Sequence, residues 1–450
     1  MLRRFAISLA LSLLARPVAA RTRPHYGGAL RVETEGDPLQ RPNGIARRLV
    51  FDGLTTIDAA GTVRPALAAE WASADADHRW QFRLRPGVHF HDGTLLTSTN
   101  AVAALNVACP SSCPWSAVHA LGAWLVFTGD APMPNLPVLL AGDEFLLALT
   151  VTADGRIPSV YIGTGPFQVA SPAKDLLQLT ANENCWQGRP FVDTLEMRAH
   201  RAIHDQWLDL SVGRTDLAEV PAEMMRPAQQ QRLTVIASPP AELLALQESE
   251  TGALANPLLR AAIAAAVDRS ALSNVIFQKQ GEVTAALLPQ QLTGYAFLFP
   301  TDRDLNKTHE LRGGLTVPSL TLSVEGDGAM QLAAQRIALN LRETGFNVQV
   351  GAPANGRPSD LTLRILPLAG GSPAAVLEAL LRSAGQPQPA IADASPASLY
   401  KAEREALDRH TLVPLLDLPR AYATGPRLRD LHLDAGGAPD LADASLEDAP

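Results

Sequence analysis

Residues 320–350 read LTLSVEGDGAMQLAAQRIALNLRETGFNVQV, and the spacing of apolar residues changes twice within this stretch. The ends, LTLSV at 320–324 and FNVQV at 346–350, are short runs typical of strands. Between them, apolar residues recur every fourth position: Ala333, Ile337 and Leu341. This pattern predicts a strand, a helix that stops at Gly345, and a second strand. Such a β-α-β unit implies parallel strands joined by a right-handed crossover, so the second half of the chain is predicted to be an α/β lobe, with a further strand at 361–366.

The first half contains a different pattern, RWQFRLRPGVHFHDGT at 79–94. Trp80, Phe82 and Leu84 alternate with polar residues, which predicts a half-buried strand. Asp92-Gly93 then turns the chain, and Thr97 is placed to cap a following helix.

The same stretch carries His89, His91 and Asp92, which could bind a metal or transfer a proton. The two histidines share a strand face, but no third ligand is placed beside them. We therefore predict no metal and no cofactor. Asp92 is expected to bond the amides of its own turn, and the histidines to belong to the scaffold.

The chain begins MLRRFAISLALSLLARPVAA, which has the basic start, short apolar run and small residues of a secretory signal peptide. We expect residues 1–20 to be removed and the protein to lie in the periplasm. No cysteine precedes Cys109, so a lipid anchor at the mature N-terminus is not expected. No later segment has the roughly 18 apolar residues of a membrane span.

Two of the three cysteines lie close together, in Cys109-Pro-Ser-Ser-Cys113. In an oxidising compartment this spacing favours a small-loop disulfide, which leaves Cys185 unpaired. Zinc is the alternative, but only His119 lies nearby as a further ligand.

The formal net charge is −8, and loss of Arg3, Arg4 and Arg16 with the signal makes it about −11. No basic block occurs, so nucleic acid is not an expected partner. The residues that follow the signal are enough for two or three packed lobes.

Ser171-Pro-Ala-Lys174 matches the S-x-x-K motif of penicillin-recognising serine enzymes. The motif is predicted to lie in a turn between strands rather than at a helix start, and neither partner motif of those enzymes is present. A serine hydrolase or transpeptidase is therefore the less favoured hypothesis.

Nine blocks, in order, resemble the family 5 extracellular solute-binding proteins, the oligopeptide, dipeptide and nickel receptors of ABC importers. They extend over nearly the whole chain after the signal. The blocks are YGGAL (26–30), FDGL (51–54), RPALAAEW (64–71), LRPGVHFHDGT (84–94), GTGPF (163–167), NENCW (182–186), GRTD (213–216), RAAIAAAVDR (260–269) and VPL (413–415).

The resemblance implies a two-lobed, type II-like α/β periplasmic binding protein fold of cluster C, which closes on its ligand. An inserted subdomain is expected in the first lobe. We assign residues 21–55, 160–242 and 413–450 to lobe I, 56–159 to the insertion and 243–412 to lobe II.

The chain departs from the peptide receptors where their acidic anchor for the ligand's amino terminus is expected, because RILPLAGGSP at 364–373 has neither an acid nor a tryptophan. Cleft contacts are instead expected from polar residues beside the predicted hinge strands. These candidates are Glu33, Glu35, Gln247, Glu248 and, on the far lobe, Arg364. Since Gln247 and Glu248 point opposite ways on a strand, at most one should contact a ligand.

The favoured function is a monomeric, non-enzymatic receptor that delivers a small solute, or a peptide, to an ABC permease in the inner membrane. The missing anchor residues keep a second hypothesis open, a degenerate receptor that acts as a sensor or partner-binding module.

Overall fold

The computed structural model describes residues 26–447, apart from 41–43, 59–60, 110–112, 151–160, 174, 317–318, 327, 353–357, 369, 390 and 392–394. The predicted signal peptide lies outside the described residues. No helix within them is long and apolar enough to cross a membrane.

A mixed sheet of eleven strands runs through the molecule. Two of its strands, β12 and β17, are much longer than the others and pair antiparallel at its centre. The strand order is β15 (Asn347–Val350), β14 (Ser319–Val324), β16 (Leu361–Pro367), β12 (Thr234–Glu248), β17 (Leu412–Thr424), β11 (Leu217–Val220), β1 (Ala29–Glu33), β10 (Thr194–Arg198), β9 (Leu176–Ala181) and β8 (Phe167–Ala173), with β13 (Glu282–Val283) on β17.

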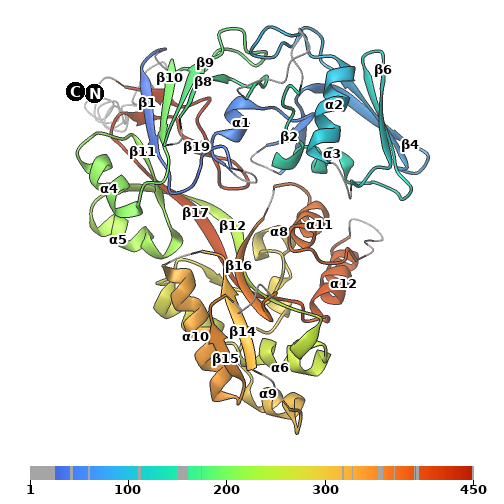
Figure 1. Cartoon of the computed structure of the whole chain (residues 1–450), viewed down its shortest axis with the longest axis vertical. Helices are drawn as coiled ribbons and strands as arrows, with labels where there is room; N and C mark the ends of the chain where they lie inside the picture. The colour runs from blue at the N-terminus through green and yellow to red at the C-terminus, as the bar shows by residue number, and fades with distance from the viewer. Residues whose placement is uncertain are drawn as a thin grey trace, which may run out of the picture.

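Two lobes lie on either side of the long pair, which forms the hinge between them (Figure 1). The predicted lobe boundaries at 242/243 and 412/413 both fall inside these strands. The backbone therefore passes between the lobes as strand rather than as loop.

Lobe I comprises β1 and β8–β11 with the helices around them. Its remaining elements are α1 (Arg47–Val50), α4 (Ile203–Ser211), η2 (Ala222–Met224), α5 (Met225–Gln230), β18 (Leu428–Arg429), β19 (His432–Leu433), β20 (Pro439–Asp440) and β21 (Ser445–Leu446).

Lobe II comprises β13–β16 and the helices that cover them. These helices are η3 (Gly252–Leu254), α6 (Pro257–Ala266), α7 (Arg269–Ala271), η4 (Leu272–Ile276), α8 (Gln290–Thr293), η5 (Ala296–Leu298), α9 (Leu305–Arg312), α10 (Ala329–Glu343), α11 (Pro373–Ser383) and α12 (Pro396–Leu407).

The predicted β-α-β unit is confirmed, since β14 and β15 are parallel and α10 connects them. The apolar stripe of α10 is fully buried against the sheet, and Gly345 follows the helix with a positive φ of 86°. The predicted strand at 361–366 is β16, which pairs parallel with β14.

The inserted subdomain lies beside lobe I and above α11 in the view of Figure 1. Its apolar cluster contains the alternating residues Trp80, Phe82 and Leu84. Its elements are β2 (Thr55–Ile57), β3 (Val63–Pro65), β4 (Ala68–Ala74), β5 (Arg79–Leu84), α2 (Ser98–Ala108), β6 (Ala117–Leu121), β7 (Trp124–Thr128), α3 (Leu136–Leu139) and η1 (Asp143–Phe145). As predicted, Thr97 caps α2, and the structure adds a capping box with Asn100.

Candidate functional site

The hinge strands β12 and β17 and their neighbour β11 present charged side chains on one face of the sheet. Glu219 of β11 lies opposite Tyr422 of β17, so the two side chains share a face of the sheet. Arg420 lies two residues before Tyr422 and points the same way. Glu242 of β12 forms an ion pair with Arg420, with 3.7 Å between Oε1 and Nε. Three strands thus bring two carboxylates, a guanidinium and a phenol together.

The loop that follows β1 covers this group and leaves a pocket of about 110 Å³, which we call the hinge pocket. The loop supplies most of its wall and the sheet supplies two charged residues. The lining residues are Thr34, Gly36, Asp37, Pro38, Gln40, Gly44, Ile45, Glu219 and Arg420. The volume suits a small solute or one end of a larger one, because most of a bound ligand must be enclosed.

Acidic residues outnumber basic ones in the wall of the hinge pocket. Burial raises the pKa of Glu219 and of Glu242, and the positive charge of Arg420 opposes both shifts. Glu219 also accepts a hydrogen bond from the backbone N–H of Glu35, at 2.6 Å. Glu242 pairs with Arg420 but does not line the pocket. The wall itself has two acidic residues, Asp37 and Glu219, and one guanidinium, so an amine-bearing solute would complete the charge balance.

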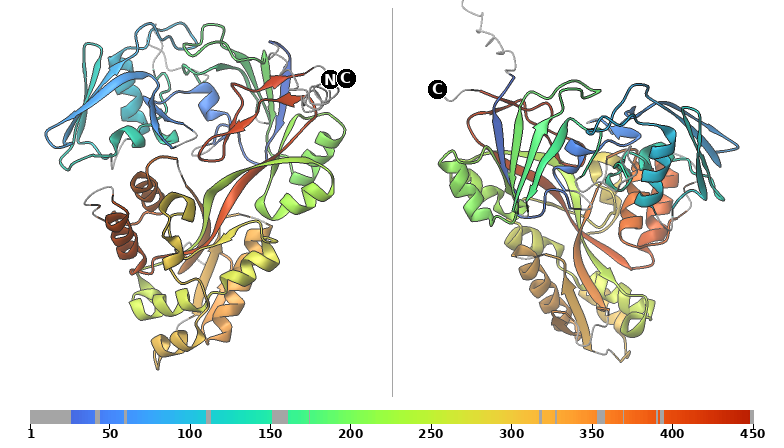
Figure 2. Two further views of the ribbon diagram at one scale, coloured as in Figure 1. Left: turned by 180° about the vertical axis from the view of Figure 1, so that it is seen from behind. Right: turned by 45° about the horizontal axis from the view of Figure 1, so that its top comes forward.

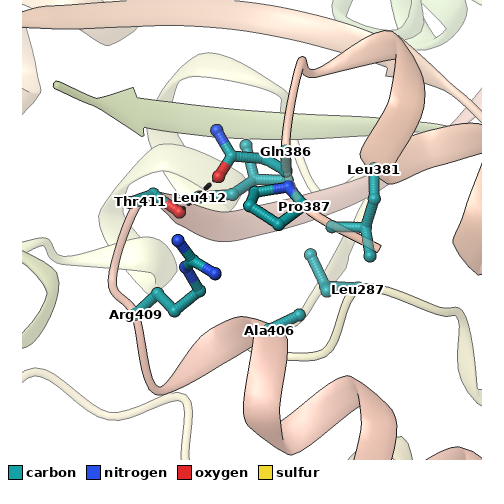
Figure 3. A pocket seen from close by; sticks show the side chains of 8 residues that line it. All are labelled: Leu287, Leu381, Gln386, Pro387, Ala406, Arg409, Thr411 and Leu412. Atoms are coloured by element: carbon teal, nitrogen blue, oxygen red, sulfur yellow. Dashed lines mark hydrogen bonds between the residues drawn. The ribbon is translucent and has the colours of Figure 1, made fainter. Parts of the chain in front are cut away.

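Figure 3 shows a second cavity, in lobe II between α11, α12 and β17. Gln386 and Thr411 are hydrogen-bonded at its edge, with 2.6 Å between their side-chain oxygens. Its volume is about 10 Å³, which is close to the space of one water molecule. This cavity is too small to be the binding site for a solute.

Two of the predicted cleft residues lie at the end of β1, but they face different surroundings. Glu33 is only 1 % exposed, and its carboxylate oxygens lie 3.5 Å from Arg198 and 3.6 Å from Arg201. Glu35 is exposed, and it contacts the hinge pocket only through its backbone bond to Glu219.

The other predicted cleft residues lie in lobe II. Arg364 donates a hydrogen bond to Gln247 Oε1 at 3.0 Å and forms an ion pair with Glu325 at 3.1 Å. Glu248 is 2 % exposed, and burial raises its pKa well above the ordinary value. The structure does not bring the five predicted residues into one site, and none lines the hinge pocket through its side chain.

The sequence reasoning missed Glu219, Glu242, Arg420 and Tyr422. A signal was available, because Glu219 closely follows the GRTD block and Arg420 closely follows the VPL block. Without the pairing of β11 with β17, however, nothing placed these residues side by side.

The HFHD cluster makes hydrogen bonds within its own turn and to the GTGPF block. His91 Nε2 donates to Gly165 O at 3.0 Å, and its Nδ1 accepts from Gly163 N at 3.3 Å. Asp92 accepts hydrogen bonds from the backbone and hydroxyl of Thr94. Among the described residues no group of three metal-binding side chains occurs. His91 therefore connects the subdomain to the GTGPF block of lobe I.

We expect His91→Ala to lower the free energy of unfolding by about 2 kcal/mol, because two bonds to partly buried backbone groups are lost. Burial lowers the pKa of His91, so the neutral ring is the folded form. The parent should therefore lose stability as the pH falls below about 6.5. The difference in free energy of unfolding between the parent and His91→Ala should then become smaller. Urea unfolding at pH 5 and pH 7.5 would measure both effects.

The matched control is His89→Ala, since His89 is exposed and its side chain bonds the Gly87 carbonyl of the adjacent turn. Its effect should stay within about 0.5 kcal/mol. Equal losses in both variants would refute the structural role of His91.

Cys109 and Cys113 are joined by a disulfide at the end of α2, and Cys185 is a buried free thiol. Burial raises the pKa of Cys185, which disfavours the reactive thiolate.

Ser171 lies within β8, where it pairs with Gln178, so its predicted position in a turn was wrong. An extended strand does not provide the helix start that an S-x-x-K nucleophile occupies. Lys174 lies outside the described residues.

Two lobes joined by a hinge of two long strands define the class of two-lobed binding proteins. Residues 62–362 match the bacterial extracellular solute-binding proteins, family 5. The chain belongs to this family.

Known relatives share both sequence and fold with this chain. It is 26 % identical over 405 residues to the probable di/tripeptide-binding protein 5 of Pseudomonas aeruginosa, covering 77 % of this chain and 75 % of that one. The periplasmic binding protein DppA of Helicobacter pylori, solved with the peptide STSA, superimposes with a TM-score of 0.80 at 17 % identity, over 94 % and 99 % of the two chains. AgaA of A. tumefaciens R10, solved with agropinic acid, gives 0.79 at 18 %, also over 94 % and 99 %. The predicted fold class is thereby confirmed.

Proposed function

We propose that this protein is the periplasmic receptor of an ABC importer and that it captures a small amine-bearing solute, or the amino end of a short peptide, in the hinge pocket. Lobe closure around the solute would create the surface that the permease recognises.

The observation that carries this proposal is the acidic hinge pocket, which lies between the loop after β1 and the strands β11 and β17, in a member of a family of binding proteins. Glu219, with Asp37 at the wall, would bind the amine. Arg420 would bind a carboxylate or carbonyl oxygen of the same solute, with charge-assisted hydrogen bonds on both sides. The di/tripeptide-binding relative supports a short peptide as one member of this ligand class.

The first experiment is native mass spectrometry of protein exported to the periplasm, which would identify a co-purifying solute. Cell fractionation of the same material would test the periplasmic location, and its size in solution would test the monomer.

Calorimetry with the identified solute should then show at least about 30-fold weaker binding for Glu219→Gln and for Arg420→Ala, because each change leaves a buried charge without its partner. Glu310→Gln, at an exposed position on α9, is the control and should bind as the parent does. Parent-like affinity in both site variants, or loss of affinity only in Arg364→Ala, would place the ligand elsewhere.

A further inference from the structure

We propose that the inserted subdomain clamps lobe II in the closed position, and that this clamp sets how much of the protein is closed before any solute binds. The clamp is formed by Asn135 and Glu144 of the subdomain and by Glu378 and Arg382 of α11. It lies away from the hinge pocket and uses none of its residues.

Two polar contacts join the inserted subdomain to lobe II. Asn135 Nδ2 donates to Glu378 Oε1 at 2.9 Å, and Arg382 lies 3.8 Å from Glu144. Glu378 and Arg382 are four residues apart on α11, so they occupy one helix face, and that face meets the subdomain.

The orientation of Asn135 supports a specific role. Asparagine at a helix N-cap ordinarily accepts a hydrogen bond from the first turn of its own helix. Asn135 occupies the N-cap of α3, yet its side chain makes no capping bond and reaches across to Glu378 instead.

Glycines allow the two surfaces to touch just before α11. A Cβ added to Gly371 would lie 2.9 Å from Val138 Cγ1, and one added to Gly370 would lie 3.1 Å from Ile57 Cγ2. Gly371 also has a φ of 135°, which other residues rarely adopt. Backbone of lobe II is therefore in direct van der Waals contact with α3 and β2.

The subdomain side of the clamp is fixed to lobe I. Arg48 of α1 forms an ion pair with Asp143 at 2.8 Å and donates to Ala141 O at 2.7 Å. Arg47 donates to Asp143 O at 2.8 Å. Lobe I, hinge, lobe II and subdomain thus form a ring that α3 and α11 close (Figure 2).

The consequence for binding follows from the pre-existing equilibrium. When only the closed form makes all the ligand contacts, the apparent dissociation constant is the intrinsic one divided by the closed fraction. Clamp residues would therefore set affinity without contacting the solute.

The test needs no ligand. Fluorophores attached at Val107→Cys on α2 and Lys401→Cys on α12, in a Cys185→Ser background, would report the opening of ligand-free mature protein by single-molecule energy transfer. Both positions are exposed. Glu378→Ala should raise the ratio of open to closed molecules about tenfold, since it removes the acceptor of the Asn135 hydrogen bond and leaves that amide without its partner. Asn135→Asp, which opposes two carboxylates, should do the same.

Glu378→Gln is the matched control, because its amide oxygen can still accept from Asn135, and it should stay within about twofold of the parent. Urea unfolding would verify that all variants are equally folded. A parent with no closed population, or equal distributions in Glu378→Ala and Glu378→Gln, would overturn the clamp. This experiment measures the distance between the subdomain and lobe II and uses no solute. Its outcome therefore does not decide whether the hinge pocket binds a solute, which the calorimetry tests separately.

Discussion

Gly163→Ala should destabilise this protein by about 4 kcal/mol or prevent its folding. A Cβ on Gly163 would lie 1.8 Å from the carbonyl oxygen of Val50, which is backbone and cannot rotate away. That carbonyl also accepts from Gly165 N at 3.1 Å, and Gly163 N donates to His91. Separating the two segments would break these bonds together.

Urea unfolding, or the yield of folded protein after export, would measure this effect. Gly314→Ala is the matched control, because a Cβ there meets nothing within 4 Å and no positive φ is required. It should be neutral or slightly stabilising. A Gly163→Ala protein that unfolds at the parent's urea concentration would contradict the close approach of the two segments.

Asp417→Asn should stabilise the protein by about 2 kcal/mol near pH 8. Asp417 is 2 % exposed, and its Oδ1 has no hydrogen-bond partner. Burial, together with the charges of Glu282 and Glu403, raises the pKa of Asp417 to about 8. Asparagine has nearly the same shape and carries no charge at any of these pH values.

The sign of the pH dependence follows from the raised pKa. The stability linked to Asp417 is fully present below its unfolded pKa of about 4 and is lost as the pH rises through about 8. The gain in Asp417→Asn should therefore be near zero at pH 4 and largest at pH 8 or above. Urea unfolding across this range would test it, with the exposed Glu405→Gln on α12 as control. A gain that does not change with pH would refute the explanation.

The local elements of the fold could be predicted because each is encoded by neighbouring residues. The apolar period of four in α10, the alternation in β5 and the helix cap at Thr97 all appear in the structure where the sequence placed them. The order of nine blocks also predicted the family and its two-lobed fold, which the comparisons confirm.

The candidate site could not be predicted in the same way. Glu219, Glu242 and Arg420 come from three strands, and only the pairing of β11, β12 and β17 brings them together. Conversely, Glu33 and Glu248 were expected to contact a ligand in the cleft, but both are almost fully buried. Burial of a single polar residue depends on which elements pack over it, and local spacing does not contain that information.

By itself, the sequence determined the elements, the fold class and the family of this protein, because periodicity, caps and turn residues act over a few neighbouring positions. Only the tertiary structure decided which charges meet. Contacts such as Asn135 with Glu378, 243 residues apart, arise when whole lobes are placed against each other. The hinge pocket and the clamp both depend on that placement. Each forms between segments that are far apart in the sequence, and the sequence alone does not show that these segments meet in the fold.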